Sequence, residues 1–194
     1  MFWKAFGNGV RMFSLRGEHM AVQVVVLNGA SSSGKTTLAR ALQDVLTETW
    51  LRTGVDMLLE MAPPRVERAL IGSDGSVDGD VPEFRAAEQV WMDAVAFLVQ
   101  SGSRVVLDEV LLSGRAGADR WQQALPGVPI LWIGVHCAPE ESERRERARP
   151  DRVPGMAALQ AGLVHRGMRY DLEVDTTSMP PEELARQIAA LIER

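Results

Sequence analysis

Residues 29–36 have the types and spacing that most directly indicate chemistry in this 194-residue chain. They read GASSSGKT, match the spacing GxxxxGK[ST], follow an apolar run and precede a helical pattern. The glycines allow close backbone approach and positive φ, so that successive N–H groups can turn toward phosphate oxygens. The N-terminus of the following helix adds partial positive charge. The segment therefore predicts a nucleotide phosphate loop, rather than a coincidental turn rich in glycine and serine.

The residues of this loop have distinct expected roles. Lys35 can reach the β- and γ-phosphates, and the Thr36 hydroxyl can ligate Mg²⁺. The three serines are expected to shape the loop rather than to react. ATP and Mg²⁺ are therefore the expected co-substrate and cofactor. The predicted nucleotide-binding residues are Gly29, Ala30, Ser31, Ser32, Ser33, Gly34, Lys35, Thr36 and Thr37.

Acidic residues follow two further strand-like runs. Asp108 ends the apolar run 105–107, and open α/β sheets bind ligands at the carboxyl ends of their strands. Asp108 is therefore predicted to hold Mg²⁺ together with Thr36. Asp56 follows another strand-like run and is predicted either to accept the proton of a substrate hydroxyl or to cap a turn. Glu109 would point to the opposite side of its strand, as a polar wall near the acceptor, a helix cap or a surface acid.

A run of arginines occupies residues 144–152 and is interleaved with acidic residues. One interpretation is a solvated helix of mixed charge. The other is a lid, because the run follows the fourth predicted strand and an arginine closing over phosphates would stabilise the transferring charge. The arginines are Arg144, Arg145, Arg147, Arg149 and Arg152.

The sequence around these candidate site residues alternates between strand-like and helix-like segments. The strands are compact β-branched runs without clean alternation, which predicts a parallel sheet flanked by helices. The helix that begins at Pro82 is expected to bury Val90, Trp91, Ala94, Val95 and Leu98. Residues 61–82 are predicted to be loop-rich and partly helical. The predicted strands are 22–27, 50–55, 104–108, 129–135 and 170–174, and the predicted helices are 36–46, 82–100, 116–124, 139–149, 153–165 and 181–193.

Composition favours one globular domain over residues 20–194, preceded by an extension at 1–19, because 46% of the chain is hydrophobic and 24% charged. The formal charge of −5 argues against a general nucleic-acid binder. No apolar stretch reaches the ~20 residues of a membrane span, and no signal-peptide core is evident, so a cytoplasmic protein without a membrane partner is expected. Cys137 is expected to be buried at a strand end, and His19, His136 and His165 to be structural or surface residues.

Six segments together resemble the chloramphenicol phosphotransferase family: LNGASSSGKT, WLRTGVDMLLE, PEFRAAEQVW, VVLDEVLLSG, ARPDRVPGMAALQ and VHRGMRYDLEVDTT. The resemblance implies a P-loop NTPase fold of nucleoside- and nucleotide-kinase type with a lid segment. It also implies ATP and Mg²⁺ as co-substrates and phosphorylation of a hydroxyl on a small antibiotic-like molecule, with Asp56 as the base. The catalytic residues it implies are Asp56, Lys35, Arg145, Arg149 and Arg152.

The chain departs from this family in residues 63–80, and Glu109 stands where the family has a second aspartate. The reaction type therefore transfers better than the acceptor's identity, because a few pocket contacts decide between related substrates. A kinase for a sugar, nucleotide or sugar nucleotide remains an alternative. A nucleotide-dependent switch module is the non-kinase alternative, although no guanine-reading NKxD sequence is evident.

Overall fold

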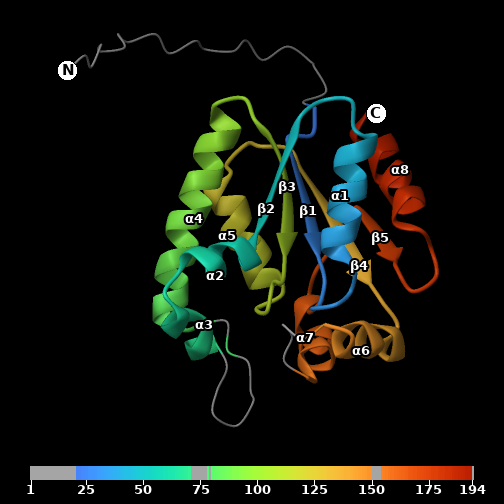
Figure 1. Ribbon diagram of the computed structural model, residues 1–194. Helices are drawn as coiled ribbons and strands as arrows, with labels where there is room; N and C mark the ends of the chain where they lie inside the picture. The colour runs from blue at the N-terminus through green and yellow to red at the C-terminus, as the bar shows by residue number, and fades with distance from the viewer. Residues whose placement is uncertain (1–20, 71–77, 79, 150–153, 194) are drawn as a thin grey trace.

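Five parallel strands form one sheet in the order β2-β3-β1-β4-β5 (Figure 1). The computed structural model describes residues 21–70, 78, 80–149 and 154–193. The strands are β1 (Val24–Asn28), β2 (Trp50–Gly54), β3 (Arg104–Glu109), β4 (Ile130–His136) and β5 (Leu172–Asp175). The parallel sheet expected from the strand–helix alternation is therefore confirmed.

The central strands are buried on both faces, which is why their sequences lack polar alternation. All five residues of β1 are buried, as are residues 105–109 of β3 and 131–135 of β4. β-branched and aliphatic side chains fit this pleated surface between two helical layers. The same burial places Asp108 and Glu109, two acids at the end of β3, against protein on opposite faces.

Eight helices surround the sheet within the described residues. Helices α1 and α8 cover one face and α4 and α5 cover the other (Figure 1). Leu38 and Ile188 are buried between α1, α8 and the sheet, and Met92 and Trp121 are buried between α4, α5 and the sheet. Each of the four is at most 1% exposed. The helices are α1 (Lys35–Val45), α2 (Val55–Met61), α3 (Pro64–Leu70), α4 (Pro82–Gln100), α5 (Arg115–Ala124), α6 (Pro139–Arg147), α7 (Met156–Val164) and α8 (Pro181–Ile192).

The remaining helices lie near the carboxyl edge of the sheet. Helices α2 and α3 lie on the β2 side, and α6 and α7 lie beyond the carboxyl ends of β1 and β4 (Figure 1). The strand register brings the carboxyl ends together, because Asn28 pairs with Glu109 and Gly54 pairs with Asp108. The short helices therefore surround the edge at which a parallel sheet presents its ligands.

Helix α4 buries a different stripe from the one predicted. Val90 is 70% exposed and Ala94 is exposed as well, whereas Met92 is buried. The true stripe includes Glu88, which is buried because two arginines contact its carboxylate. Because a charged residue lies on the buried face, the apolar residues alone indicated a different face of the helix. The buried residues are Phe84, Glu88, Met92, Val95, Ala96 and Val99.

Cys137 was expected to be buried, but it is partly exposed one residue beyond β4. The prediction of an extension at 1–19 concerns residues outside the described ranges, as does part of the loop-rich stretch 61–82. Where that stretch is described, α3 forms, in line with the expected partial helicity. Among the helices of the described ranges, none combines the length and apolar character needed to cross a bilayer.

Candidate active site

The loop between β1 and α1 has the sharp backbone geometry that a phosphate loop needs. Gly34 has a φ of 89°, and a Cβ there would lie 3.1 Å from Arg145 Nη1. Gly29 is needed for close approach instead, since a Cβ would lie 2.4 Å from the Val135 carbonyl oxygen. Ser32 has a φ of 59°, a region that residues with side chains rarely adopt. The loop thus curls between β4 and the lid side of the sheet edge.

Lys35 folds back over this loop. Its Nζ donates a 2.8 Å hydrogen bond to the Ala30 carbonyl oxygen, and the residue is only 6% exposed. A buried ammonium group is costly unless it is well compensated, and anionic phosphate oxygens are stronger acceptors than a carbonyl. The position therefore suits Lys35 for contact with nucleotide phosphates.

The loop also contains polar atoms that lack a protein partner. The Oγ atoms of Ser31, Ser32 and Ser33 are buried and make no hydrogen bond within the described part of the chain. Buried hydroxyls are normally hydrogen-bonded, and phosphate oxygens could accept from groups of this kind. The loop residues therefore fit a bound nucleotide.

Thr36 and Asp108 form a ready oxygen pair at the sheet edge. The Thr36 hydroxyl donates a 2.6 Å hydrogen bond to Asp108 Oδ2, and Asp108 is 9% exposed. Among the described residues no group of three or more His, Cys, Asp or Glu side chains could hold a metal ion. Mg²⁺ is commonly bound by one or two protein oxygens plus substrate phosphates, so this pair fits that ion when a nucleotide is present.

Asp56 reaches the same place from β2. Gly54, the last residue of β2, lies so close to β3 that a Cβ would be 2.0 Å from the Asp108 carbonyl oxygen. The chain then enters α2 directly, with exposed Asp56 in its first turn. Close approach at Gly54 is therefore what brings Asp56 to the carboxyl edge.

The arginines of the predicted lid differ in their contacts. Arg145 donates to Glu141 and, through Nη2, to the Thr176 carbonyl oxygen at 2.7 Å, which holds its guanidinium beside Gly34. Arg144 is more exposed and also pairs with Glu141. Hydrogen bonds from Arg144 and Arg145 lower the pKa of Glu141 to about 2.

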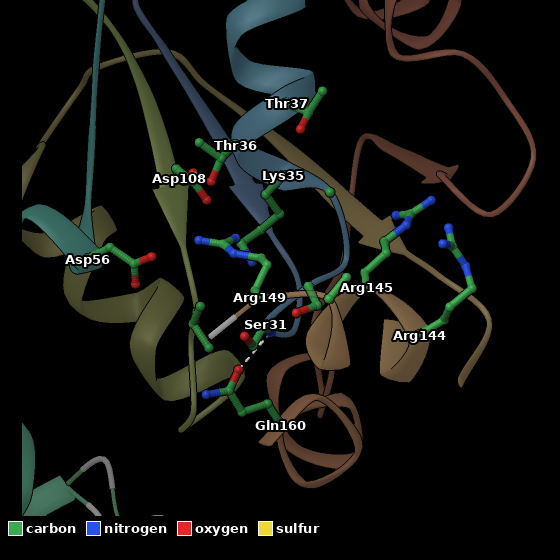
Figure 2. A pocket seen from close by; sticks show the side chains of 14 residues that line it. Ser31, Lys35, Thr36, Thr37, Asp56, Asp108, Arg144, Arg145, Arg149 and Gln160 are labelled. Atoms are coloured by element: carbon green, nitrogen blue, oxygen red, sulfur yellow. Dashed lines mark hydrogen bonds between the residues drawn. The ribbon is translucent and has the colours of Figure 1, made fainter. Parts of the chain in front are cut away.

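Figure 2 shows these side chains around one pocket of ≈ 330 Å³. It brings together most of the predicted site residues. Arg149 lines it just beyond the end of α6, whereas Arg152 falls outside the described ranges. Gly29, Ala30 and Ser33 belong to the loop but do not line the pocket. The predicted residues that line it are Ser31, Ser32, Gly34, Lys35, Thr36, Thr37, Asp56, Asp108, Arg144, Arg145 and Arg149.

Glu109 is neither a surface acid nor a helix cap, because β3 continues through it and leaves it 4% exposed. Burial raises its pKa well above the ordinary value, and the Glu88, Asp108 and Asp56 carboxylates add to the effect. Its Oε1 makes no hydrogen bond within the described ranges. Glu109 therefore backs the site as a buried acid on the face of the sheet opposite Asp108.

Two polar side chains, Gln160 and Asn28, make contacts that were not foreseen from the sequence. Gln160 of α7 accepts a 2.7 Å hydrogen bond from Ser31 N–H. Buried Asn28 donates to the Val164 carbonyl and the Tyr170 hydroxyl, both at 2.7 Å. Gln160 and Asn28 both lie in segments that resemble the chloramphenicol phosphotransferase family. That resemblance was the only sequence feature that pointed to these two residues. Their spacing from other polar residues matches no motif that would assign them a role.

A second hollow of ≈ 260 Å³ adjoins the first. The two share Gly34, Thr37 and Arg145, and the second continues along the loop that joins β5 to α8. This loop supplies apolar Met179 as well as hydroxyl groups. The hollow could therefore hold a flat polar ligand by both apolar contact and hydrogen bonds. The β5–α8 residues that line it are Thr176, Thr177, Ser178, Met179, Pro180 and Pro181.

Comparison with known proteins agrees with this geometry. Residues 22–193 match the family described as "Chloramphenicol phosphotransferase-like protein". The chain belongs to this family. It is accordingly an ATP-dependent phosphotransferase of the P-loop kinase class, as expected from the phosphate loop and the six family-like segments.

Curated relatives of the chain and solved structures of other proteins with a similar fold extend the comparison. Two Mycobacterium tuberculosis proteins, from strains CDC 1551 and H37Rv, are named as candidate O-phosphotransferases. Each is 33% identical over 181 residues, covering 86% of this chain and 80% of theirs. A Janibacter sugar kinase superposes with a TM-score of 0.67 at 18% identity, covering 89% of this chain and 95% of its own. A Sinorhizobium meliloti gluconokinase gives 0.63 at 21% identity, covering 91% and 94%.

An APS kinase from Mycobacterium tuberculosis, in complex with AMPPNP and APS, shares the same fold. It superposes with a TM-score of 0.57 at 17% identity, covering 90% of this chain and 99% of its own. Likeness at this level of identity concerns the arrangement of the chain. It confirms the P-loop kinase fold that the sequence predicted.

Proposed function

We propose that this chain transfers the γ-phosphate of ATP to a hydroxyl of a small, antibiotic-like molecule of the chloramphenicol type. The observation that carries the proposal is that Asp56 lines the same pocket as Lys35, Thr36 and Asp108. A base and a set of phosphate-binding groups in one pocket are what alcohol phosphorylation requires. The family description and the O-phosphotransferase names of the curated relatives support a hydroxyl acceptor.

The two hollows suggest how the nucleotide lies. The β-phosphate would rest against the N-terminus of α1, where Gly34 to Thr37 present backbone N–H groups. The nucleoside would then occupy the second hollow beside Thr176 and Pro180. The γ-phosphate would point the other way, toward Ser31 and Asp56. An acceptor hydroxyl between Asp56 and the loop would face the phosphorus atom in line.

In the proposed step the acceptor hydroxyl gives its proton to the Asp56 carboxylate as its oxygen bonds to the γ-phosphorus. The bond from that phosphorus to the β,γ-bridging oxygen breaks, and ADP leaves with the electron pair. Lys35 and Arg145 would stabilise the charge on the phosphoryl oxygens. Mg²⁺, held by Thr36 and Asp108, would supply further neutralisation of phosphate charge when bound.

Product analysis tests this function directly. The purified chain would be incubated with ATP and MgCl₂ against a panel of hydroxyl-bearing antibiotics that includes chloramphenicol, and against sugars and nucleosides. We expect mass spectrometry to show one added phosphate on a member of the antibiotic panel, and none with Lys35→Ala. Phosphorylation confined to sugars or nucleosides would overturn the acceptor class. ATP turnover without any phosphorylated alcohol would overturn the transfer itself.

A further inference from the structure

Gln160 connects α7 to the phosphate loop through one end of its amide. Its Oε1 accepts the 2.7 Å hydrogen bond from Ser31 N–H, and its half-buried side chain lines the main pocket. Figure 2 shows the nitrogen end of the amide turned away from Ser31, toward the side of the view where Asp56 lies. That nitrogen makes no hydrogen bond to another described residue. The amide of this pocket-lining residue therefore retains two N–H donors without a described protein acceptor.

Helix α7 is held at both ends, so the amide is fixed in place. At its start, the buried carboxylate of Glu146 accepts 2.7 Å and 2.8 Å hydrogen bonds from the N–H groups of Gly155 and Ala157. At its end, the Val164 carbonyl accepts from Asn28, the last residue of β1. Gln160 and Val164 are four residues apart and so share one helix face. That face is joined to the start of the phosphate loop by two hydrogen bonds, one from Ser31 to Gln160 and one from Asn28 to Val164.

The fixed amide extends the donor set of the loop. Ser31 is the third residue of the loop and lines the same pocket as Asp56, and its N–H already donates to Gln160. An amide whose oxygen accepts a hydrogen bond becomes a better donor at its nitrogen, because the two bonds polarise each other. The Ser31 N–H is thus not available to a phosphate, and the Gln160 nitrogen is the donor that remains at this part of the pocket wall.

We propose that the Gln160 amide donates a hydrogen bond to the γ-phosphate and so makes the site bind ATP more tightly than ADP. The inference rests on the proposed function for the direction of the nucleotide, with its γ-phosphate toward Ser31 and Asp56. A nucleotide in this direction places its terminal phosphate beside Gln160, whereas the β-phosphate lies over the N-terminus of α1. Gln160 thus distinguishes ATP from ADP by direct contact with the phosphate to be transferred.

Calorimetric binding of ADP and of the non-hydrolysable analogue AMPPNP, both with MgCl₂, tests the proposal without any acceptor. In Gln160→Met, which keeps the length of the side chain but removes its polar atoms, AMPPNP should bind about tenfold more weakly. ADP should bind within about twofold of the wild-type chain, because no γ-phosphate is present. Gln160→Glu keeps an acceptor for Ser31 N–H and replaces the donor with a negative charge. Its affinity for AMPPNP should therefore fall further than that of Gln160→Met. Gln187→Met, at an exposed position of α8, is the matched control and should bind both nucleotides like wild type.

The outcomes separate this inference from the proposed function. If Gln160→Met weakens the binding of ADP and of AMPPNP equally, Gln160 only supports the loop. If both affinities are unchanged, Gln160 does not contact the γ-phosphate. Either result overturns the inference. A wild-type chain that binds AMPPNP and ADP equally also overturns it, whatever alcohol the enzyme phosphorylates. A chain that keeps the AMPPNP preference but phosphorylates no alcohol overturns the proposed function alone.

Discussion

The Thr36 hydroxyl donates a 2.6 Å hydrogen bond to Asp108 Oδ2, across 72 residues of sequence. The contact joins the first turn of α1 to β3, next to the loop that carries Lys35. Because both oxygens are already held together, binding a metal–nucleotide complex would require little further ordering of these side chains. The metal side of the proposed site is thus preorganised by the fold.

Asp108→Asn should weaken the use of Mg²⁺. Asparagine keeps the shape and the acceptor for Thr36 but removes the negative charge that favours a divalent cation. We expect the Mg²⁺ concentration for half-maximal rate to rise about tenfold, measured by titration at fixed ATP. Asp44→Asn, at an exposed position of α1, is the matched control. An unchanged Mg²⁺ dependence in Asp108→Asn would remove Asp108 from the metal site.

Asp56→Asn should stop the proposed proton transfer while sparing the nucleotide. Loss of a positioned general base lowers kcat by about 10²–10⁴-fold. ATP affinity, measured by calorimetry, should stay within about twofold because the phosphate loop is unchanged. Glu60→Gln, an exposed acid on the same helix, should have normal kcat. A fully active Asp56→Asn enzyme would refute the assignment of the base.

Two neighbouring arginines should respond differently to alanine. Arg145→Ala removes the guanidinium held beside Gly34 by Thr176, and kcat/KM for ATP should fall about 10²-fold or more. Arg144→Ala removes a more exposed side chain paired with Glu141, so the change should remain within about threefold. Steady-state kinetics on both variants checks the contrast. Equal losses would indicate that the lid acts through its overall charge rather than through Arg145.

Glu146→Ala should loosen α7. The variant leaves the N–H groups of Gly155 and Ala157 without their carboxylate, at a cost of about 2–4 kcal/mol in the free energy of unfolding. Urea denaturation measures this loss. Glu143→Ala, one turn away and paired with Arg147 at the surface, should cost no more than about 0.5 kcal/mol. Similar costs for both variants would show that the cap on α7 contributes little.

His165 should make the protein less stable in mild acid. Burial, and next the neighbouring His136, lower its pKa to about 4 from an ordinary value of 6.5. Between those two values the unfolded chain binds a proton that the folded chain does not, so the free energy of unfolding falls as pH falls from 6.5 toward 4. The ring stacks on His136 with centroids 4.2 Å apart, and its Nδ1 is 2.7 Å from the Tyr170 hydroxyl.

The comparison is between urea denaturation of the wild type and of His165→Gln at several pH values. The variant lacks the titrating ring, so its stability should decline less steeply across that window. The buried and surface carboxylates are common to both proteins and cancel in the difference. An equal decline in the two would contradict a lowered pKa at His165.

The fold was largely predictable because local patterns and tertiary contacts agree. The three central strands, β1, β3 and β4, are apolar runs rich in β-branched residues, and Gly34 stands where the backbone needs positive φ. The prediction for α4 failed at Val90 because the stripe is completed by Glu88, whose burial depends on Arg85 and Arg120 from two different helices. The pair with Arg85 is local, but the pair with Arg120 joins two helices and leaves no periodic signal in a single sequence.

Residue types and their spacing were enough to predict the phosphate loop, the alternation of strands and helices, the acid after β2 and the acids at the end of β3. These are local properties, fixed by residue type and spacing over a few turns of chain. Three facts came from the three-dimensional arrangement alone: Gln160 reaches Ser31, Arg145 rather than Arg144 is held beside Gly34, and Glu109 is buried. Those facts depend on which helices cover the carboxyl edge of the sheet, and this is settled by long-range packing rather than by local preference.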